Sequence, residues 1–252
     1  MELRVDDLGL RFAGLTALDG VSLTVPSGAL QAVIGPNGAG KTSLFNCISG
    51  VYQPQRGSLH FGDVDLRSLR PHQMAGAGVA RMFQNLAVFP HLTVLENLLL
   101  GRHHLWRSSW LADVLALPAS RREEVRHRAR VEEIIEFLDL EAVRKTPAGV
   151  LPYGVLKRVE LGRALAMEPR LLLLDEPAAG LNQEETEDLA RYLLDVHEER
   201  GITMLLIEHD LGFVLDLADR VAVLDFGRLV AEGTPDEIAA NPLVQAAYGV
   251  AG

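Results

Sequence analysis

A glycine-rich stretch, GPNGAGKTS at residues 35–43, constrains the fold more than any other part of the 252-residue chain. The apolar run Leu30–Ile34 comes directly before it, and Leu44, Phe45 and Ile48 recur after it at helical spacing. The stretch is therefore predicted to join a strand to a helix. Glycine has no Cβ, so such a loop lets successive backbone N–H groups converge on one point.

The C-terminal half of the chain alternates between strand and helix patterns. Four consecutive leucines at 171–174 are followed by a helical pattern over 183–200 and an apolar strand over 203–207. A helix over 212–219 and a strand over 220–224 come next. This alternation predicts an α/β fold with a parallel sheet covered by helices.

The N-terminal part and the middle of the chain have different patterns. Short alternating strands are predicted in the first sixty or so residues, with Asp19-Gly20 as a turn and a further strand pair flanking Gly62-Asp63. Residues from about 96 to 144 are rich in helix formers and contain Trp106, Trp110 and the run RREEVRHRAR, which we interpret as a solvated helical face. We expect one domain over 1–252, in which a core of 1–95 and 165–252 carries a helical insertion at about 96–164.

Composition excludes several classes of protein. Acidic residues outnumber basic ones by 34 to 24, and this balance argues against nucleic acid as the main partner. The single cysteine, Cys47, cannot form an internal disulfide, and the N-terminus has no basic flank followed by an apolar signal core. The apolar region at 202–226 is interrupted by charges and does not predict a membrane span. We expect a cytoplasmic chain.

The glycine-rich stretch fits the pattern G-x-x-x-x-G-K-[ST] of phosphate-binding loops. Its backbone N–H groups and the following helix N-terminus favour phosphate oxygens, Lys41 would reach the β- and γ-phosphates, and the Thr42 hydroxyl would face Mg²⁺. Ser43 is expected to cap the loop. The nucleotide-binding residues predicted here are Asn37, Gly38, Ala39, Gly40, Lys41, Thr42 and Ser43.

A second motif places two acids at the end of the leucine strand. Asp175 and Glu176 follow residues 171–174, and such strand ends are where ligands collect in open α/β sheets. Asp175 would hold Mg²⁺ directly or through water. Glu176 would polarise an attacking water, as a hydrolytic ATPase requires.

With these two motifs in this order, the chain resembles the ATP-binding subunits of ABC transporters. Gln84 falls where that family has its Q-loop glutamine, which senses Mg²⁺ and the attacking water, and His209 matches the switch histidine that contacts the γ-phosphate. The expected catalytic residues are therefore Glu176, His209, Gln84 and Lys41. The expected metal ligands are Thr42, Gln84 and Asp175. Phe12 matches the aromatic residue that stacks on adenine, although a core position is equally consistent with its place in the strand.

Further elements are similar to the subgroup that serves branched-chain amino acid uptake, the Liv type. They are AAGLN at 178–182, a helical insertion at 101–133, LDFGR at 224–228, AEGTP at 231–235, and Asn241-Pro242 leading to Ala247-Tyr248-Gly249. The resemblance implies a P-loop ABC-ATPase domain with a RecA-like parallel core, an N-terminal antiparallel β subdomain and an inserted α-helical subdomain.

The stretch LPYGVLKR at 151–158, just ahead of a predicted helix, falls where the family has its LSGGQ signature. In that family two subunits dimerise head to tail, so Gly154 would approach the ATP of a partner subunit in trans. Pro152 replaces the serine whose hydroxyl would bond the γ-phosphate, and Tyr153 replaces a glycine. At least one hydrogen bond to ATP is therefore expected to be missing.

The resemblance implies an ATP- and Mg²⁺-dependent subunit of an importer on the inner face of the cell membrane. Its partners would be a second ATP-binding subunit, identical or not, two transmembrane permease subunits and indirectly a solute-binding protein, with no nucleic acid. A groove near Gln84, Phe83, Phe89 and Leu92 would dock a permease helix, unless those apolar residues are core. Branched-chain or other hydrophobic amino acids, urea, amides and aromatic acids stay open as solutes. Non-transport ABC-type ATPases and P-loop kinases are the alternatives of another class.

Overall fold

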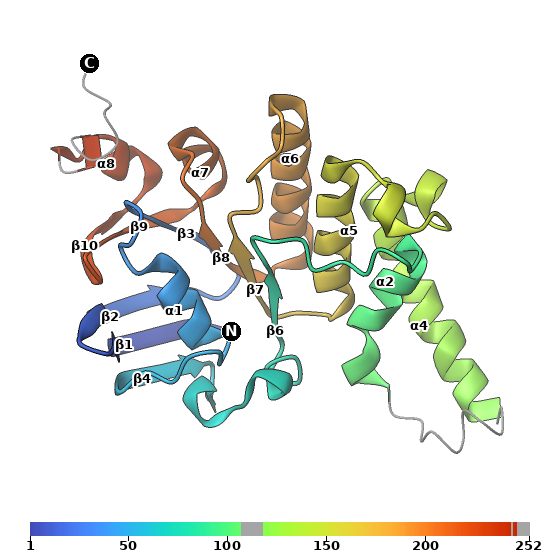
Figure 1. The fold of residues 1–252 in the computed structure, drawn as a ribbon, viewed down its shortest axis with the longest axis horizontal. Coiled ribbons are helices and arrows are strands. Elements are labelled where there is room, and N and C mark those ends of the chain that lie inside the picture. Colours follow the sequence, from blue (N-terminus) through green and yellow to red (C-terminus); the bar gives the residue numbers. More distant parts are fainter. Residues whose placement is uncertain (107–117, 243, 246–252) are drawn as a thin grey trace. The chain divides into compact units, whose positions relative to one another are not determined.

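The computed structural model describes residues 1–106, 118–242 and 244–245 (Figure 1). Trp110, part of the predicted insertion at 101–133 and the predicted match at Ala247-Tyr248-Gly249 lie outside the described residues. The chain forms two compact units, a core unit of Met1–Gln84 with Arg170–Gly252 and a helical unit of Asn85–Pro169. The helical insertion expected at about 96–164 falls inside the second unit.

A six-stranded sheet organises the core unit, in the order β10-β9-β3-β8-β7-β6. Its parallel strands are β3 (Leu30–Ile34), β6 (Val79–Met82), β7 (Leu171–Asp175), β8 (Thr203–Ile207) and β9 (Arg220–Asp225). β10 (Arg228–Gly233) pairs antiparallel with β9 at one edge. The predicted parallel sheet is confirmed, and its carboxyl-terminal edge collects the ends of β3, β6, β7 and β8.

A second, antiparallel sheet has the order β2-β1-β4-β5, with β1 (Leu3–Phe12), β2 (Leu15–Val25), β4 (Arg56–Phe61) and β5 (Val64–Asp65). The prediction of a turn at Asp19-Gly20 is wrong, because both residues lie within β2. Leu8 pairs with Val21 and Gly9 with Asp19, so Gly20, at φ 74°, is the extra residue of a β-bulge. The hairpin turns at Ala13-Gly14 instead.

Both faces of the parallel sheet are buried. Alternate residues of β7, Leu171 and Leu173, share one apolar cluster with the antiparallel sheet and with helix α1 (Lys41–Ile48). Leu172 and Leu174 are equally buried and point to the opposite face, because side chains alternate along a strand. The remaining helices of this unit are α6 (Gln183–Arg200), α7 (Leu211–Leu217) and α8 (Pro235–Ala239) (Figure 1).

The helical unit contains α2 (Val94–Gly101), α4 (Pro118–Phe137) and α5 (Tyr153–Ala166), which pack on one another. Short 3-10 helices complete the described structure: η1 (Leu66–Ser68), η2 (Pro71–Gln73), η3 (His103–Leu105), η4 (Glu141–Val143) and η5 (Ala148–Val150). No helix in the described part of the chain combines the length and apolarity needed to cross a membrane.

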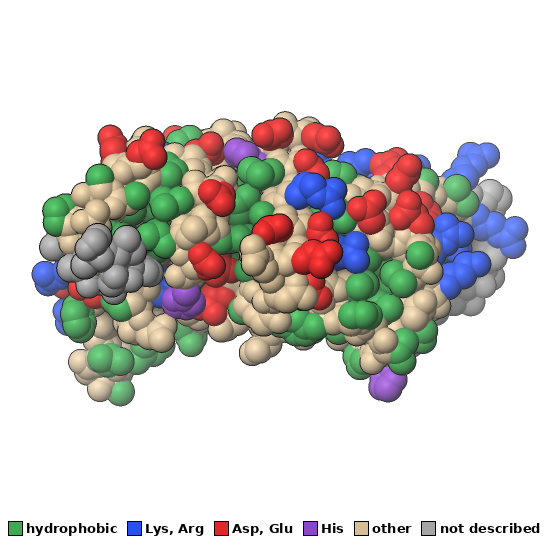
Figure 2. All heavy atoms as spheres, turned by 90° about the horizontal axis from the view of Figure 1, so that it is seen from above, with side chains coloured by type: hydrophobic (Ala, Val, Ile, Leu, Met, Phe, Trp, Pro, Cys, Tyr) green, Lys and Arg blue, Asp and Glu red, His purple; other side chains and the backbone are tan. Residues whose placement is uncertain are grey.

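The mixed-charge run at 121–130 lies in α4, and the prediction that it forms a solvated face is confirmed for most of its residues. Figure 2 shows Lys and Arg side chains as well as Asp and Glu side chains exposed on the face that it draws. His127 is the exception in the run, because it is only 5 % exposed. A buried histidine within an exposed charged run indicates a specific structural contact.

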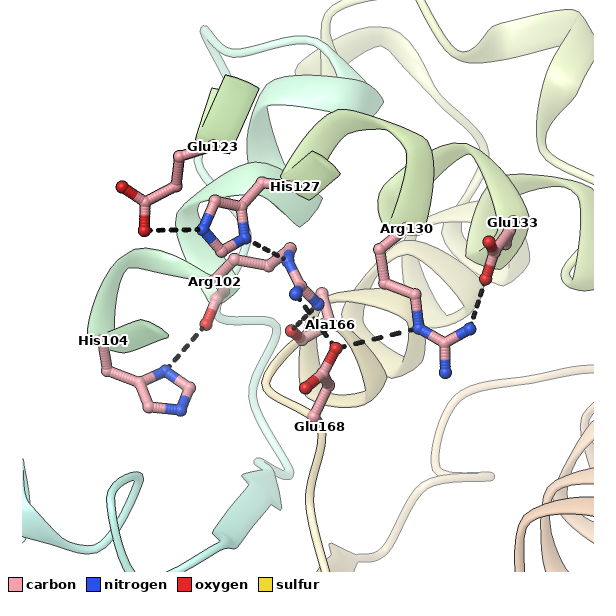
Figure 3. Close-up of polar contacts among 9 residues, drawn as sticks. Arg102, His104, Glu123, His127, Arg130, Glu133, Ala166 and Glu168 are labelled. Carbon is pink, nitrogen blue, oxygen red and sulfur yellow. Dashed lines mark hydrogen bonds and ion pairs between the residues drawn. The ribbon is translucent and has the colours of Figure 1, made fainter. Parts of the chain in front are cut away.

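That contact is with Arg102, as Figure 3 shows. Arg102 Nε donates to His127 Nδ1 at 2.9 Å, and its two other nitrogens bind Ala166 O and Glu168 Oε1, each at 3.0 Å. The ring of Trp106 stacks on His127 with centroids 5.2 Å apart. Since Nδ1 accepts a hydrogen bond, His127 is neutral here. Burial, aided by the Arg102 charge, lowers its pKa, and Glu123, whose Oε1 lies 3.7 Å from His127 Nε2, opposes that effect without reversing it.

This geometry makes the stability of the protein depend on pH. The unfolded chain takes up a proton on His127 near its ordinary pKa of about 6.5, whereas the folded chain resists it, so stability is full above that pH and falls as the pH drops below it. We predict that His127→Asn, whose side-chain oxygen can still accept from Arg102, flattens this dependence in urea unfolding between pH 7.5 and 5.5.

His104→Asn is the matched control, since His104 is exposed and its ring Nδ1 lies 3.3 Å from Gly101 O. It should leave the slope of the parent protein intact. An unchanged slope in His127→Asn would show that other groups cause the acid sensitivity.

Candidate active site

The glycine-rich loop leads directly into α1, which begins at Lys41 with Gly40 as its N-cap residue. Ser43 is the third residue of the helix, so the expectation that it caps the loop is wrong. The Lys41 Nζ donates to the carbonyl oxygens of Gly35 at 2.6 Å and Pro36 at 3.1 Å. Burial lowers the pKa of Lys41, and the carboxylates of Glu176 and Asp175 oppose that effect.

An open cleft of about 400 Å³ lies over this loop. Most of the predicted site residues line it: Phe12, Asn37, Gly38, Ala39, Gly40, Lys41, Thr42, Ser43, Glu176 and His209. Gln84 and Asp175 do not line the cleft, but Gln84 is hydrogen-bonded to Glu176, which does, and Asp175 directly precedes Glu176 in the chain. Phe12 is 41 % exposed and meets the Tyr52 ring edge-on at 5.0 Å, so it forms a wall of the cleft and is not a core residue.

Glu176 joins three of the predicted residues into one group. Its Oε2 accepts from Gln84 Nε2 at 2.6 Å, and its Oε1 lies 2.6 Å from His209 Nε2. Gln84 follows β6, Glu176 follows β7 and His209 follows β8, so the parallel sheet brings all three to one edge. Glu176 has a left-handed backbone at φ 49°, a strained conformation for a non-glycine residue that turns the chain sharply after β7.

Asp175 is held by an arginine that sequence reasoning did not identify. Arg81, in the middle of β6, forms a buried ion pair with Asp175 Oδ2. The same guanidinium binds Asn46 Oδ1 at 2.7 Å and Ser49 Oγ at 3.0 Å, both on or next to α1. Arg81 thereby ties β7 to the helix that follows the glycine-rich loop. Its only signal in the sequence is a charge within an otherwise apolar strand.

Glu208 is a second residue that sequence reasoning missed, since it was counted only as a charge interrupting an apolar region. It is 4 % exposed, and burial raises its pKa. Its two oxygens accept the backbone N–H groups of Ala178 at 2.9 Å and His209 at 3.0 Å. Glu208 therefore fixes the loop after Glu176 and the loop of His209 to one carboxylate.

The signature-like stretch lies in the helical unit. The expectation that it comes ahead of a helix is only partly right, because α5 already begins at Tyr153 and includes Gly154. Pro152 is the N-cap residue of α5 and provides no side-chain hydrogen bond to the helix. Lys157 is fully buried, with its Nζ 5.7 Å from the centre of the Tyr153 ring.

Comparison with known proteins decides the family. The model of the ABC transporter family matches residues 18–179, a range that contains the glycine-rich loop, Gln84, Asp175 and Glu176. The chain belongs to the ABC transporter family. A second model, for the C-terminal part of branched-chain amino acid ATP-binding cassette transporters, matches residues 228–248.

Full-length relatives of this ABC protein agree. The chain is 41 % identical over 246 residues to the high-affinity branched-chain amino acid transport ATP-binding protein BraF of Pseudomonas aeruginosa, covering 98 % of this chain and 96 % of BraF. It is 38 % identical to LivG of Escherichia coli K12 with the same coverage.

Solved structures give the same picture. An ABC transporter cassette in its ADP conformation superposes with a TM-score of 0.85 at 34 % identity, covering 98 % of both chains, and a nucleotide-free cassette gives 0.84. The chain is thus an ATP-binding cassette, an ATPase domain of the α/β class with a parallel-rich core sheet and an antiparallel N-terminal sheet.

The Arg81–Asp175 pair makes a prediction about stability. Arg81→Ala leaves the buried carboxylate of Asp175 without its cation, and breaking one half of a buried pair costs about 3–5 kcal/mol. We expect a loss of that size in the free energy of unfolding, measured with urea.

Arg4→Ala is the control, because the Arg4–Glu2 pair is 53 % and 44 % exposed and such surface pairs contribute little. Equal and small effects of the two substitutions would contradict the structural role assigned to Arg81.

Proposed function

We propose that this chain binds and hydrolyses ATP to drive an importer of branched-chain or other hydrophobic amino acids. The observation that carries the proposal is the hydrogen-bonded group of Gln84, Glu176 and His209 at the cleft over the glycine-rich loop. The solute class rests on the names of BraF and LivG and on the C-terminal family match.

In this proposal the glycine-rich loop binds the phosphates of ATP. The N–H groups of residues 37–43 and the N-terminus of α1 supply partial positive charge, and Lys41 adds a full one. The Nζ of Lys41 donates to Gly35 O and Pro36 O in this structure. When ATP binds, it would donate to β- and γ-phosphate oxygens instead. Phe12, exposed on the cleft wall, would stack on adenine.

The residues present also fit Mg²⁺, which prefers oxygen ligands and phosphate partners. Thr42 is exposed and lines the cleft, and Asp175, whose Oδ2 is paired with Arg81, would offer its Oδ1 to the metal or to a water on it. Gln84 would join them through its amide oxygen, because its Nε2 donates to Glu176. The ion would neutralise charge on the phosphates during transfer.

Glu176 is the proposed base. Its carboxylate is mostly buried, at 14 % exposure, and both oxygens have hydrogen-bond partners that fix its orientation. Release of one partner would free an oxygen to accept a proton from the attacking water. His209 would then donate toward the γ-phosphate, a contact that its exposed ring can reach from the cleft.

We further propose that two such subunits pair head to tail, so that Gly154 and the start of α5 complete the ATP site of the partner. Closure on ATP and separation after hydrolysis would be passed to two transmembrane permease subunits, with a solute-binding protein acting through them. The chain would accordingly work at the inner face of the cell membrane. The second ATP-binding subunit is either another copy or a sister chain.

Pro152→Ser tests the role of the altered signature. A serine at the N-cap of α5 would bond a free helix N–H, raising stability by about 1 kcal/mol, and would add a hydroxyl for the partner's γ-phosphate. We expect a higher melting temperature together with stronger ATP-driven dimerisation and faster turnover.

Pro152→Ala is the matched control, since it removes the proline ring without supplying a hydroxyl. It should leave dimerisation close to the parent level. If Pro152→Ser is more stable but dimerises and turns over like the parent, the trans contact is refuted.

The function itself is tested in a complex of this chain with its permease, reconstituted in vesicles. Leucine, isoleucine and valine, presented by the solute-binding protein, should stimulate ATP hydrolysis. Glu176→Gln should still bind ATP, because the amide preserves the size of the side chain and the phosphates are bound by the loop, yet lose turnover by at least about a hundredfold.

Urea, short amides and aromatic acids serve as comparison solutes in the same assay. Stimulation by one of these alone would replace the amino-acid assignment. Hydrolysis by Glu176→Gln at the parent rate would show that Glu176 is not the base.

A further inference from the structure

Three large apolar side chains are exposed around the cleft over the glycine-rich loop. Phe226 is 85 % exposed, Leu15 is 71 % exposed and Phe12 is 41 % exposed, and all three line this cleft. Single exposed apolar residues are common on protein surfaces, but a group of them at one concave site marks a binding surface. Phe226 is the most exposed of the three, and the proposed function leaves it without a role.

The backbone at Phe226 is strained. Asp225 pairs with Arg228, so Phe226 and Gly227 form a two-residue turn between β9 and β10, with φ values of 42° and 76°. Turns with positive φ at both positions favour asparagine, aspartate or glycine, and a phenylalanine at the first position is unfavourable. Folding alone would thus favour another residue here. Strain retained at such a position points to a function of the side chain.

The same turn is fixed in place against the phosphate loop. The Gly227 N–H donates to Ala39 O at 2.9 Å, and Gly227 O accepts from Asp19 N at 2.8 Å. Arg228 adds an ion pair to Asp19 at 2.7 Å. A Cβ on Gly227 would lie 2.7 Å from Ala17 O, so the turn packs closely on β2. Phe226 is therefore held at the cleft by backbone contacts on two sides.

We propose that Phe226 is a binding residue for the nucleoside part of the nucleotide, forming with Phe12 and Leu15 an apolar wall for the base and ribose. This inference rests on the proposed nucleotide binding at the cleft. Lys41 and the loop N–H groups suit the phosphates, while the base is the part of a nucleotide that an aromatic face can bind. A ring face does not distinguish purines by their edges, so ATP and GTP should depend on Phe226 alike.

Phe226→Asn separates this role from folding, because Asn-Gly is the favoured sequence for such a turn. The ligand-free variant should melt at or above the temperature of the parent chain. Its affinity for ATP and for GTP, measured by isothermal titration calorimetry, should be about 5- to 100-fold weaker, the range for loss of one stacking residue. Its affinity for inorganic tripolyphosphate, which has no base, should be unchanged.

Two variants serve as controls. Phe226→Tyr keeps the ring and should retain the affinity of the parent for ATP. Val230→Ala removes another exposed apolar side chain from the same hairpin, one that does not line the cleft. It should leave the affinities for ATP and for tripolyphosphate unchanged.

Each other outcome overturns the inference. Equal weakening for ATP and tripolyphosphate would assign Phe226 to the shape of the phosphate loop, and a lower melting temperature would assign it to folding. Unchanged ATP affinity with weaker ATP-driven dimerisation would assign it to the partner subunit. If the parent chain itself fails to bind ATP, the proposed function fails rather than this inference alone.

Discussion

The close packing of the glycine-rich loop on its neighbours is the constraint on which the site depends. A Cβ on Gly35 would lie 2.0 Å from Leu224 O, and one on Gly40 would lie 2.6 Å from Ala17 O. The loop is therefore pressed against β9 on one side and β2 on the other, where side chains would not fit. This packing fixes the loop and the start of α1, whose residues line the cleft. It also explains why the antiparallel sheet matters to a site built mainly on the parallel one.

Carboxylates at the ends of two buried strands form the other half of the site. Asp175 is held by Arg81, Glu176 by Gln84 and His209, and Glu208 by two backbone N–H groups. Each acid has at least one partner from another segment of the chain, and Glu176 and Glu208 both bind His209, so several segments are fixed at this edge of the sheet. If ATP binding moves the loop of Gln84 or of His209, the hydrogen bonds of Glu176 would change as well. Nucleotide binding would thereby be linked to the proposed movement of the subunits.

The sequence predicted the parallel strands β3, β7, β8 and β9, of which β7 and β8 are buried on both faces and have no polar alternation, but it did not predict β6 (Val79–Met82), whose apolar run is short and contains Arg81. The convergence of Gln84, Glu176 and His209 followed from motif order together with the family resemblance. Arg81 and Glu208 were missed, since their partners come from other segments of the chain and no local pattern records them. Asp19-Gly20 was mistaken for a turn because a β-bulge uses the same residue types. The burial of His127 was also missed, because the residue lies in a charged run and its burial depends on elements from other parts of the chain that pack around it.

The central claim is that the glycine-rich loop and Lys41 bind the phosphates of ATP in this cleft. Calorimetric titration of the purified chain with ATP and Mg²⁺, beside a Lys41→Ala variant, tests it most directly. We expect one saturable site per chain in the parent protein, with affinity lost by at least about tenfold when the lysine charge is removed. Absence of binding to the parent chain, or equal affinity in Lys41→Ala, would contradict it.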